Sequence, residues 1–198
     1  MVTTMWLIVE LMRNQDTLSR VRQEIAEAMG TKTAMIDDSI LSTCEYFQAC
    51  VKETLRLHIP GPFLVPHQAL ENFVLNDYTI PKDSILLVNA WTIQLDPENW
   101  KDGTSFKPDR FFGSKVDFRG NHFEYIPFGS GRRMCPGYQI GFRNVQLVVA
   151  CLIYYFDWSL PDGENPENLD TGDIFHAGGL RREKPLFMIP RLRKKYIV

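Results

Sequence analysis

The chain of 198 residues is 44% hydrophobic, which is enough for one sizeable hydrophobic core. Its formal net charge of −2 gives no electrostatic reason to expect a nucleic-acid partner, and we expect none. The four cysteines lack the spacing of a zinc finger, and a chain of this length does not need disulfides to hold together. We therefore expect a single domain over residues 1–198, in which Cys44, Cys50 and Cys151 are reduced and structural.

The sequence carries no recognisable signal peptide or membrane-spanning segment. The first residues lack the basic segment of a secretory signal peptide, and the longest apolar run, over residues 145–156, is too short to cross a bilayer. We therefore expect no membrane anchor in this chain. Near the C-terminus, four basic side chains are expected to form a solvated tail, namely Arg191, Arg193, Lys194 and Lys195.

Three helices are expected in the first third of the chain. Residues 2–13 are apolar nearly all round, which is typical of a buried helix. A second helix is predicted from apolar residues at helical spacing, Leu18, Val21, Ile25 and Met29. Gly30 should end it, and a loop should follow over residues 31–39. A third helix, over about residues 46–57, must end before Pro60 because proline geometry disfavours its continuation.

The third helix carries an acidic and a basic residue on one face. Glu53 and Arg56 are three residues apart, so their side chains are neighbours on the helix surface. Taken alone, such a pair is best interpreted as an exposed ion pair worth less than about 1 kcal/mol.

Short strands are expected after the third helix. Two apolar runs, residues 73–75 and 78–80, flank Asn76-Asp77, a dipeptide typical of tight turns. Residues 84–88 supply another run of strand type. These segments predict a small β-sheet.

The last third of the chain again favours a helix followed by irregular structure. Residues 140–156 are rich in aliphatic and aromatic side chains, which is typical of a helix buried on several sides. Residues 161–172 should form an acidic loop, and residues 187–190 a final strand. The expected fold class is mainly α with a small β-sheet.

The segment over residues 127–137 concentrates three glycines, two arginines and one cysteine ahead of that helix. Glycines permit positive φ and let a cofactor approach the backbone closely. Cys135 lies at the expected helix start, where unpaired amides and the helix dipole favour the thiolate, the form that binds metals. Arg133 could pair with carboxylates of a bound group. The alternative interpretation is that an isolated cysteine is simply a small buried hydrophobe.

Five of these residues form a recognisable pattern. Phe128, Gly131, Arg133, Cys135 and Gly137 reproduce Phe-x-x-Gly-x-Arg-x-Cys-x-Gly, and the segment resembles the haem-binding loop of cytochromes P450. The resemblance implies haem b (iron protoporphyrin IX) as cofactor, with Cys135 as the axial thiolate and metal ligand. It also implies that Arg133 meets a haem propionate, that Phe128 packs beside the thiolate, and that Gly131 and Gly137 make room for the porphyrin.

Two further motifs extend the resemblance to the middle of the chain. Residues 52–56 resemble the Glu-x-x-Arg signature of a P450 helix, and residues 106–111 resemble the Pro-Glu-Arg-Phe block, with aspartate where glutamate is commoner. In the family the arginine of that block, here Arg110, joins the helix residues, here Glu53 and Arg56, in a buried structural triad. Such a triad can fix a core, although removing one member leaves the others uncompensated.

The resemblance also assigns residues around the bound groups. His67 precedes a glutamine that replaces a frequent propionate-facing arginine, so it could act as the cofactor-binding donor, although a lone histidine is usually a surface or core residue. Two apolar segments fall where the family contacts its substrate, and their substrate-facing residues are Phe63, Leu64, Val65 and, within residues 175–180, Leu180. They predict a hydrophobic small-molecule substrate, with ordinary core packing as the alternative.

The N-terminal helix places the chain within the family fold. Trp6 and Glu10 match the family's Glu-Trp-x-x-x-Glu-Leu region, and counting back from Trp6 puts the oxygen-activating threonine before Met1. No catalytic residue is therefore assigned, and Thr3 and Thr4 are expected to be helix-interior residues. The chain is expected to be a single partial P450 domain, the haem-binding C-terminal half of the fold.

The activity implied by the resemblance is that of a haem-thiolate monooxygenase of the plant microsomal type. Such an enzyme inserts one atom of O₂ into a hydrophobic small molecule, with electrons from NADPH through NADPH-cytochrome P450 reductase, here in plant specialised metabolism. The full-length family lies on the cytosolic face of the endoplasmic reticulum membrane, whereas a chain without the anchor would be cytosolic or peripheral.

Two alternatives remain open at this point. One is a truncated haem-binding or non-catalytic P450 remnant that keeps the thiolate loop without turnover. The other is an interaction module without haem, which has no evident need for the glycine-rich loop.

Overall fold

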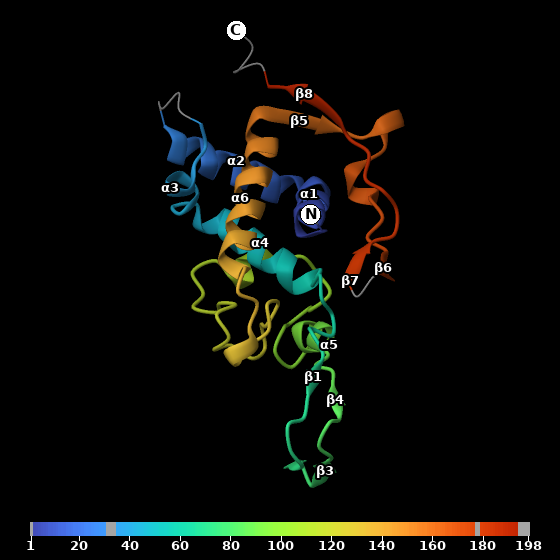
Figure 1. The fold of residues 1–198 in the computed structure, drawn as a ribbon. Coiled ribbons are helices and arrows are strands. Elements are labelled where there is room, and N and C mark those ends of the chain that lie inside the picture. Colours follow the sequence, from blue (N-terminus) through green and yellow to red (C-terminus); the bar gives the residue numbers. More distant parts are fainter. Residues whose placement is uncertain (1, 31–34, 177–178, 194–198) are drawn as a thin grey trace.

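The computed structural model describes residues 2–30, 35–176 and 179–193 (Figure 1). Its helices are α1 (Val2–Arg13), α2 (Gln15–Met29), α3 (Asp38–Leu41), α4 (Glu45–Leu57), α5 (Ala90–Leu95) and α6 (Tyr138–Tyr155). Its strands are β1 (His67–Gln68), β2 (Phe73–Leu75), β3 (Tyr78–Ile80), β4 (Ile85–Leu86), β5 (Phe156–Ser159), β6 (Asp173–His176), β7 (Gly179–Arg182) and β8 (Ile189–Leu192). The mainly helical fold class with small β-structure is confirmed.

The helices α1, α2, α4 and α6 pack together and supply most of the hydrophobic core (Figure 1). The apolar stripe predicted for α2 is buried, since Leu18, Val21, Ile25 and Met29 are at most 3% exposed. Most of α1 is also buried, which confirms the prediction made from its nearly uniform apolar sequence.

Local signals explain where the first helices begin and end. Gly30 has φ +53° and closes α2 with its amide bonded to the carbonyls of Ala26 and Glu27. The first turn of α4 is capped from another helix, because the Glu24 carboxylate accepts the amides of Tyr46 and Phe47, each at 2.8 Å.

The prediction of a loop over residues 31–39 is wrong for its last two residues, which belong to a helix. The Asp37 carboxylate accepts the Ile40 amide at 3.0 Å, and this N-cap starts the short helix α3 at Asp38. Residues 31–34 lie outside the described residues.

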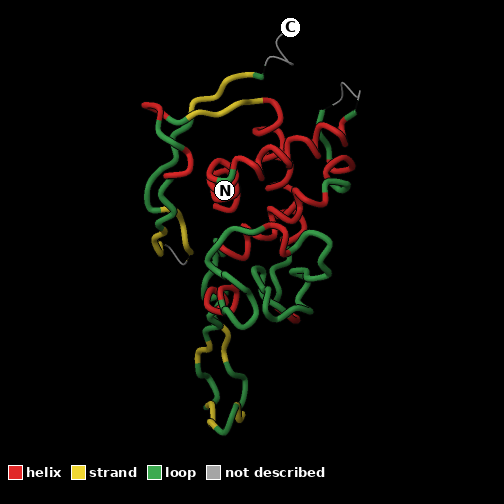
Figure 2. The backbone as a smooth tube through the Cα atoms, turned by 180° about the vertical axis from the view of Figure 1, so that it is seen from behind, coloured by secondary structure: helices red, strands yellow, loops and turns green. Residues whose placement is uncertain are grey.

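The strands pair in antiparallel twos: β1 with β4, β2 with β3, β5 with β8 and β6 with β7. The β2–β3 hairpin turns at Asn76 and Asp77, whose positive φ values of 47° and 65° are those of a tight hairpin turn, as expected from the sequence. With β1 and β4 it forms an arm that projects away from the helices (Figures 1 and 2). The strands expected in this region are thus present, but they form separate two-stranded ladders and not one small sheet.

The C-terminal part differs from the sequence expectations in three details. The loop over residues 161–172 contains two short 3₁₀ turns, and the last strand begins at Ile189, two residues later than predicted. Arg193 is not a freely solvated tail residue, because its guanidinium donates to the Tyr154 carbonyl at 3.1 Å and its amide to the Tyr155 carbonyl at 2.9 Å. Lys194 and Lys195 lie outside the described residues.

Burial of α6 is uneven along its length. Val149, Ala150 and Ile153 are at most 2% exposed, whereas Ile140 is 68% and Val148 46% exposed. The prediction of a helix buried on several sides therefore holds only from Val149 to Tyr155, where no residue is exposed. Among the described residues, no helix combines the length and apolar character that a bilayer-crossing segment requires.

Candidate cofactor-binding site

The segment that carries Cys135 is a tight loop ahead of α6. Gly129 and Gly131 have φ values of +74° and +69°, which side chains other than glycine rarely adopt. A 3₁₀ turn over Gly131–Arg133 follows, and the Cys135 amide then returns to the Phe128 carbonyl at 2.9 Å. The loop leaves Cys135 exposed, three residues before the start of α6.

An aromatic cluster supports this loop from the side. The ring of Phe118 makes an edge contact with Phe128 at a centroid distance of 5.3 Å and with Tyr138 at 5.9 Å. Gly120, with φ +84°, lies so close to the loop that an added Cβ would be 3.4 Å from the Ser130 Cα. Sequence reasoning missed Phe118 and Gly120 as supports of the loop. Gly120-Asn121 is typical of a turn, but neither it nor the nearby phenylalanine indicates which segment the turn packs against.

A cavity of about 770 Å³ lies beside the loop, between α1, α4 and α6. Its walls are mostly apolar, and they include Ile8 from α1, Leu55 from α4, and Phe142 and Val145 from α6, together with Phe128 from the loop. Thr3 and Thr4 lie within α1, as the sequence predicted, and they also line this cavity.

Glycines leave the loop and the start of α6 open. A Cβ added at Gly131, Gly137 or Gly141 would meet no atom within 4 Å. Of these, only Gly131 also needs glycine for its positive φ. Arg133 is exposed beside them. The combination of an exposed thiol, a cation, open backbone and an apolar cavity suits a flat apolar group with acidic substituents bound through a metal.

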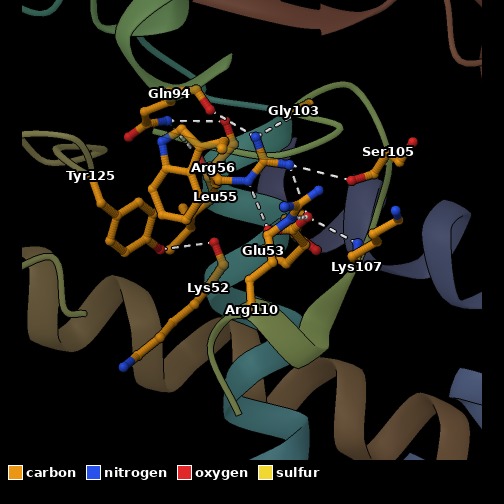
Figure 3. A network of polar contacts seen from close by, with 12 residues as sticks. Lys52, Glu53, Leu55, Arg56, Gln94, Gly103, Ser105, Lys107, Arg110 and Tyr125 are labelled. Atoms are coloured by element: carbon orange, nitrogen blue, oxygen red, sulfur yellow. Dashed lines mark hydrogen bonds and ion pairs between the residues drawn. The ribbon is translucent and has the colours of Figure 1, made fainter. Parts of the chain in front are cut away.

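The second polar centre is a buried ion network on α4 (Figure 3). Arg56 and Glu53 are both completely buried, and the guanidinium donates two hydrogen bonds of 2.8 Å to the carboxylate. Arg110 donates to the same carboxylate at 3.2 Å, and the Lys107 amide adds a bond of 2.9 Å. The structure thus brings Glu53, Arg56 and Arg110 together, and the alternative of an exposed ion pair is wrong.

The remaining donors of Arg56 tie α4 to α5 and to the segment that follows it. They reach the carbonyls of Gln94 and Gly103, each at 2.7 Å, and that of Ser105 at 3.3 Å. The Gln94 amide in turn donates to the last carbonyls of α4, those of Leu55 and Arg56 (Figure 3). A composition-based analysis could not identify Gln94, because its partners are backbone carbonyls distant in sequence.

The two apolar segments expected to face a substrate meet in space. The rings of Phe63 and Phe175 contact edge to face at a centroid distance of 6.1 Å, and the Leu180 amide donates to the Pro60 carbonyl at 2.9 Å. Leu64 has φ 52°, an unusual value for leucine, and its side chain lies next to Gly129 of the cysteine loop. Val65 is 79% exposed. Residues 177–178 of the second segment lie outside the described residues.

His67 occupies a different place. It lies on β1 opposite Leu86, is exposed, and is absent from the described residues that line the cavity.

Sequence reasoning also missed a buried histidine. The His58 Nε2 lies 2.8 Å from the Glu10 Oε1, and its ring stacks on Trp6 at a centroid distance of 3.8 Å. Its position directly after a helix and before a proline is typical of a C-cap and gives no indication of the helix that it contacts.

The family model "Cytochrome P450" matches residues 1–189 of the chain. Plant relatives include dihydroniloticin synthase of Ailanthus altissima, 46% identical over 95% of this chain and 37% of its own length, and salviol synthase of Salvia pomifera, 41% identical over 96% of this chain and 38% of its own length. The chain thus spans less than two fifths of these relatives.

Solved structures agree with the sequence comparisons. A zebrafish cytochrome P450 determined with progesterone superposes with a TM-score of 0.80 and 27% identity, over 96% of this chain and 42% of that one. A second structure of a zebrafish cytochrome P450, determined with abiraterone, gives a TM-score of 0.84 and 26% identity, over 98% of this chain and 43% of that one. Since the family model covers nearly the whole chain and the fold is shared, this chain belongs to the cytochrome P450 family.

Proposed function

We propose that the chain is the haem-binding part of a plant haem-thiolate monooxygenase, which inserts one atom of O₂ into a hydrophobic small molecule. The observation that carries this proposal is Cys135, exposed at the end of a glycine-rich loop whose Phe128 lines an apolar cavity. Membership of the P450 family supports haem b as the cofactor and a thiolate as its axial ligand.

The residues of this chain would divide the binding of haem among them. Cys135 would supply the metal ligand, Arg133 a cation for a propionate, and Phe128 an aromatic side chain next to the thiolate. Gly131 and Gly137 would leave space for the porphyrin, since neither has an atom near its added Cβ. When bound, a thiolate-ligated haem supplies O–O bond cleavage. His67 is a further proposed donor, although its exposed place on β1 gives it the weakest structural support.

The substrate class follows from the walls of the site. Apolar side chains of α1 and α6 would exclude water from the reacting groups. We propose that Phe63, Leu64, Val65 and Leu180 face the substrate, and the contacts of Phe63 with Phe175, of Leu64 with Gly129 and of Leu180 with Pro60 support this, although none of the four lines the cavity itself. The plant relatives bear the names of synthases for different products, among them salviol and dihydroniloticin, which supports a role in plant specialised metabolism.

Partners and location are proposed from the family. Electrons would come from NADPH through NADPH-cytochrome P450 reductase, and the full-length protein would act at the cytosolic face of the endoplasmic reticulum membrane. The main core joins α1, α2, α4 and α6, which supports one partial domain over residues 1–198.

The competing proposal is a haem-binding or non-catalytic remnant. It differs from the first proposal in one measurable respect, the absence of turnover in a chain that binds haem.

Haem reconstitution tests the cofactor assignment. We expect the reduced, CO-treated wild type to show the red-shifted Soret band of thiolate-ligated haem, and Cys135→Ser to lose it because an alcohol does not replace the thiolate. Cys151→Ser is the matched control and should keep the band. An unshifted band in the wild type, or an unchanged one in Cys135→Ser, would refute the assignment.

A turnover assay then separates enzyme from remnant. The haem-loaded chain is incubated with NADPH, a plant P450 reductase and a panel of hydrophobic plant metabolites. Oxygenated product supports the monooxygenase, whereas a normal Soret band without product in any assay supports the haem-binding remnant.

A further inference from the structure

Trp6, Glu10 and His58 form a buried cluster between α1 and the end of α4, here called the Trp–Glu–His cluster. Trp6 and Glu10 are one helical turn apart on α1, so both side chains point to the same partner. That partner is His58, whose Nε2 lies 2.8 Å from the Glu10 Oε1 while its ring is parallel to the indole, with an interplanar angle of 4°. None of the three residues is more than 8% exposed.

The cluster sits directly behind a wall of the apolar cavity. On α1 the neighbouring residues Met5 and Ile8 line that cavity, and Pro60, two residues after His58, lines it from the other side. His58 is the residue at which α4 ends, so its position sets the direction in which the chain leaves the helix.

The opposite side of the cluster faces a polar cleft of about 510 Å³. Besides Glu10 and His58, the titratable groups that line it are Arg13 from α1 and Asp173 from β6. Asn14 donates to the Glu10 carboxylate at 3.4 Å. The Glu10 carboxylate therefore has polar partners from the residues that directly follow α1 and α4, Asn14 and His58, while the apolar cavity lies on the other side of α1.

An apolar trio of similar volume could hold two helices equally well, since burying a polar pair costs desolvation. A hydrogen bond is directional, however, and a stacked ring restricts the tilt of the neighbouring side chain. The cluster can therefore define both the rotation of α1 about its own axis and the position of α1 along the axis of α4. Stability alone does not require such groups.

We propose that the Trp–Glu–His cluster is a positioning device that sets the separation between α1 and the segment over residues 60–65, and thereby the width of the cavity and the size of ligand admitted. The inference rests on the proposed function for the identity of what binds there. None of the three residues lines the cavity, so they would act on its width through the lining residues Met5, Ile8 and Pro60.

The decisive variant replaces both polar partners, Glu10→Leu with His58→Leu. Because no charge is left unpaired, its free energy of unfolding should stay close to that of the wild type. The conservative variant His58→Gln keeps a donor for Glu10 and should be intermediate. The matched control is His122→Gln with Glu124→Gln, which removes a half-exposed histidine–glutamate pair of 3.3 Å elsewhere in the chain.

The first readout needs no haem. Three amides bond to carbonyls of the positioned segment: Leu180 to Pro60, Leu64 to Gly61 and Trp91 to Pro62. We expect the double leucine variant to exchange these amide hydrogens about tenfold faster, while the amides of α2 stay unchanged. Exchange rates equal to those of the wild type, or a uniform increase across all helices, would overturn the proposal.

The second readout uses the haem-loaded chain and two iron-binding probes of different size, imidazole and clotrimazole. The double leucine variant should change the ratio of their dissociation constants about tenfold, whereas the control should keep it. An unchanged ratio would refute the claim about cavity width. If the wild type takes up no haem, the proposed function fails and the exchange experiment alone decides the inference.

Discussion

The Glu53 carboxylate is inaccessible to water, and its burial is tolerated because three groups donate to it. Arg56 supplies two bonds, Arg110 one, and the Lys107 amide one. The two arginines are not equivalent. Arg56 is completely buried and also holds three backbone carbonyls, whereas Arg110 is 12% exposed and contributes a single longer bond to Glu53.

The stability cost of substitution should follow this difference. Arg56→Ala is expected to lower the free energy of unfolding by about 3–5 kcal/mol, because it strands Glu53 and unpairs buried carbonyls. Arg110→Ala should cost less, since Glu53 keeps Arg56. Arg143→Ala is the control: its pair with Asp38 is exposed and should be worth less than about 1 kcal/mol. Denaturant titration measures the order of the three losses in free energy of unfolding. If Arg56→Ala yields no folded protein, the loss for Arg110→Ala must still exceed the loss for Arg143→Ala.

Gln94 provides a second prediction for a single residue. Its Nε2 satisfies two carbonyls at the end of α4, while its Oε1 is buried without a hydrogen-bond partner among the described groups. Gln94→Ala should therefore destabilise the fold by about 1–3 kcal/mol. Gln94→Glu should be worse, since it places a carboxylate against carbonyl oxygens and supplies no donor. Thermal unfolding of both variants would contradict this account if glutamate were tolerated better than alanine.

Within the helices and strands, the effect of replacing a glycine depends on which atoms an added Cβ would meet. Gly141 lies inside α6 with open space where its Cβ would be, whereas a Cβ at Gly179 in β7 would lie 2.7 Å from the Pro60 carbonyl oxygen. The first glycine weakens its helix, and the second lets the β6–β7 hairpin approach the segment after α4.

Opposite effects of the same substitution should result. Gly141→Ala is expected to stabilise the haem-free chain by about 0.5–1 kcal/mol, because alanine restricts the unfolded backbone and favours the helix. Gly179→Ala should destabilise it, because the hairpin must move and loses the bond from Leu180 to Pro60. Calorimetry of both variants checks the signs, and equal shifts in one direction would contradict the explanation.

Over the whole molecule, the core determines which thiols react. Burial, and to a lesser extent the Glu24 carboxylate, raises the pKa of Cys44 from its ordinary 9.0 to about 11. Burial likewise raises the pKa of Cys50 well above its usual value and raises that of Cys151. Cys135, in contrast, is exposed.

Alkylation with iodoacetamide at neutral pH should therefore modify Cys135 first and Cys44 and Cys50 only on unfolding, with mass spectrometry as the readout. The raised pKa values also destabilise the fold in alkali. The contribution of Cys44 to stability is complete below pH 9.0 and should be lost as the pH rises towards about 11, because the unfolded thiol ionises first. Rapid labelling of Cys50 in the folded chain, or unchanged stability over this range, would count against a closed core.

Local signals in the sequence were enough to predict the helices α1, α2 and α4, the β2–β3 turn and the cysteine loop, because each depends on apolar periodicity, on glycines or on a motif of fixed spacing. The burial of Glu53 and Arg56, the contacts of Gln94 and His58 with their partners, and the place of Thr3 and Thr4 at a cavity became evident only in the folded chain. Burial, ion pairing and packing depend on groups far apart in the chain, and no local pattern indicates which of these groups will meet.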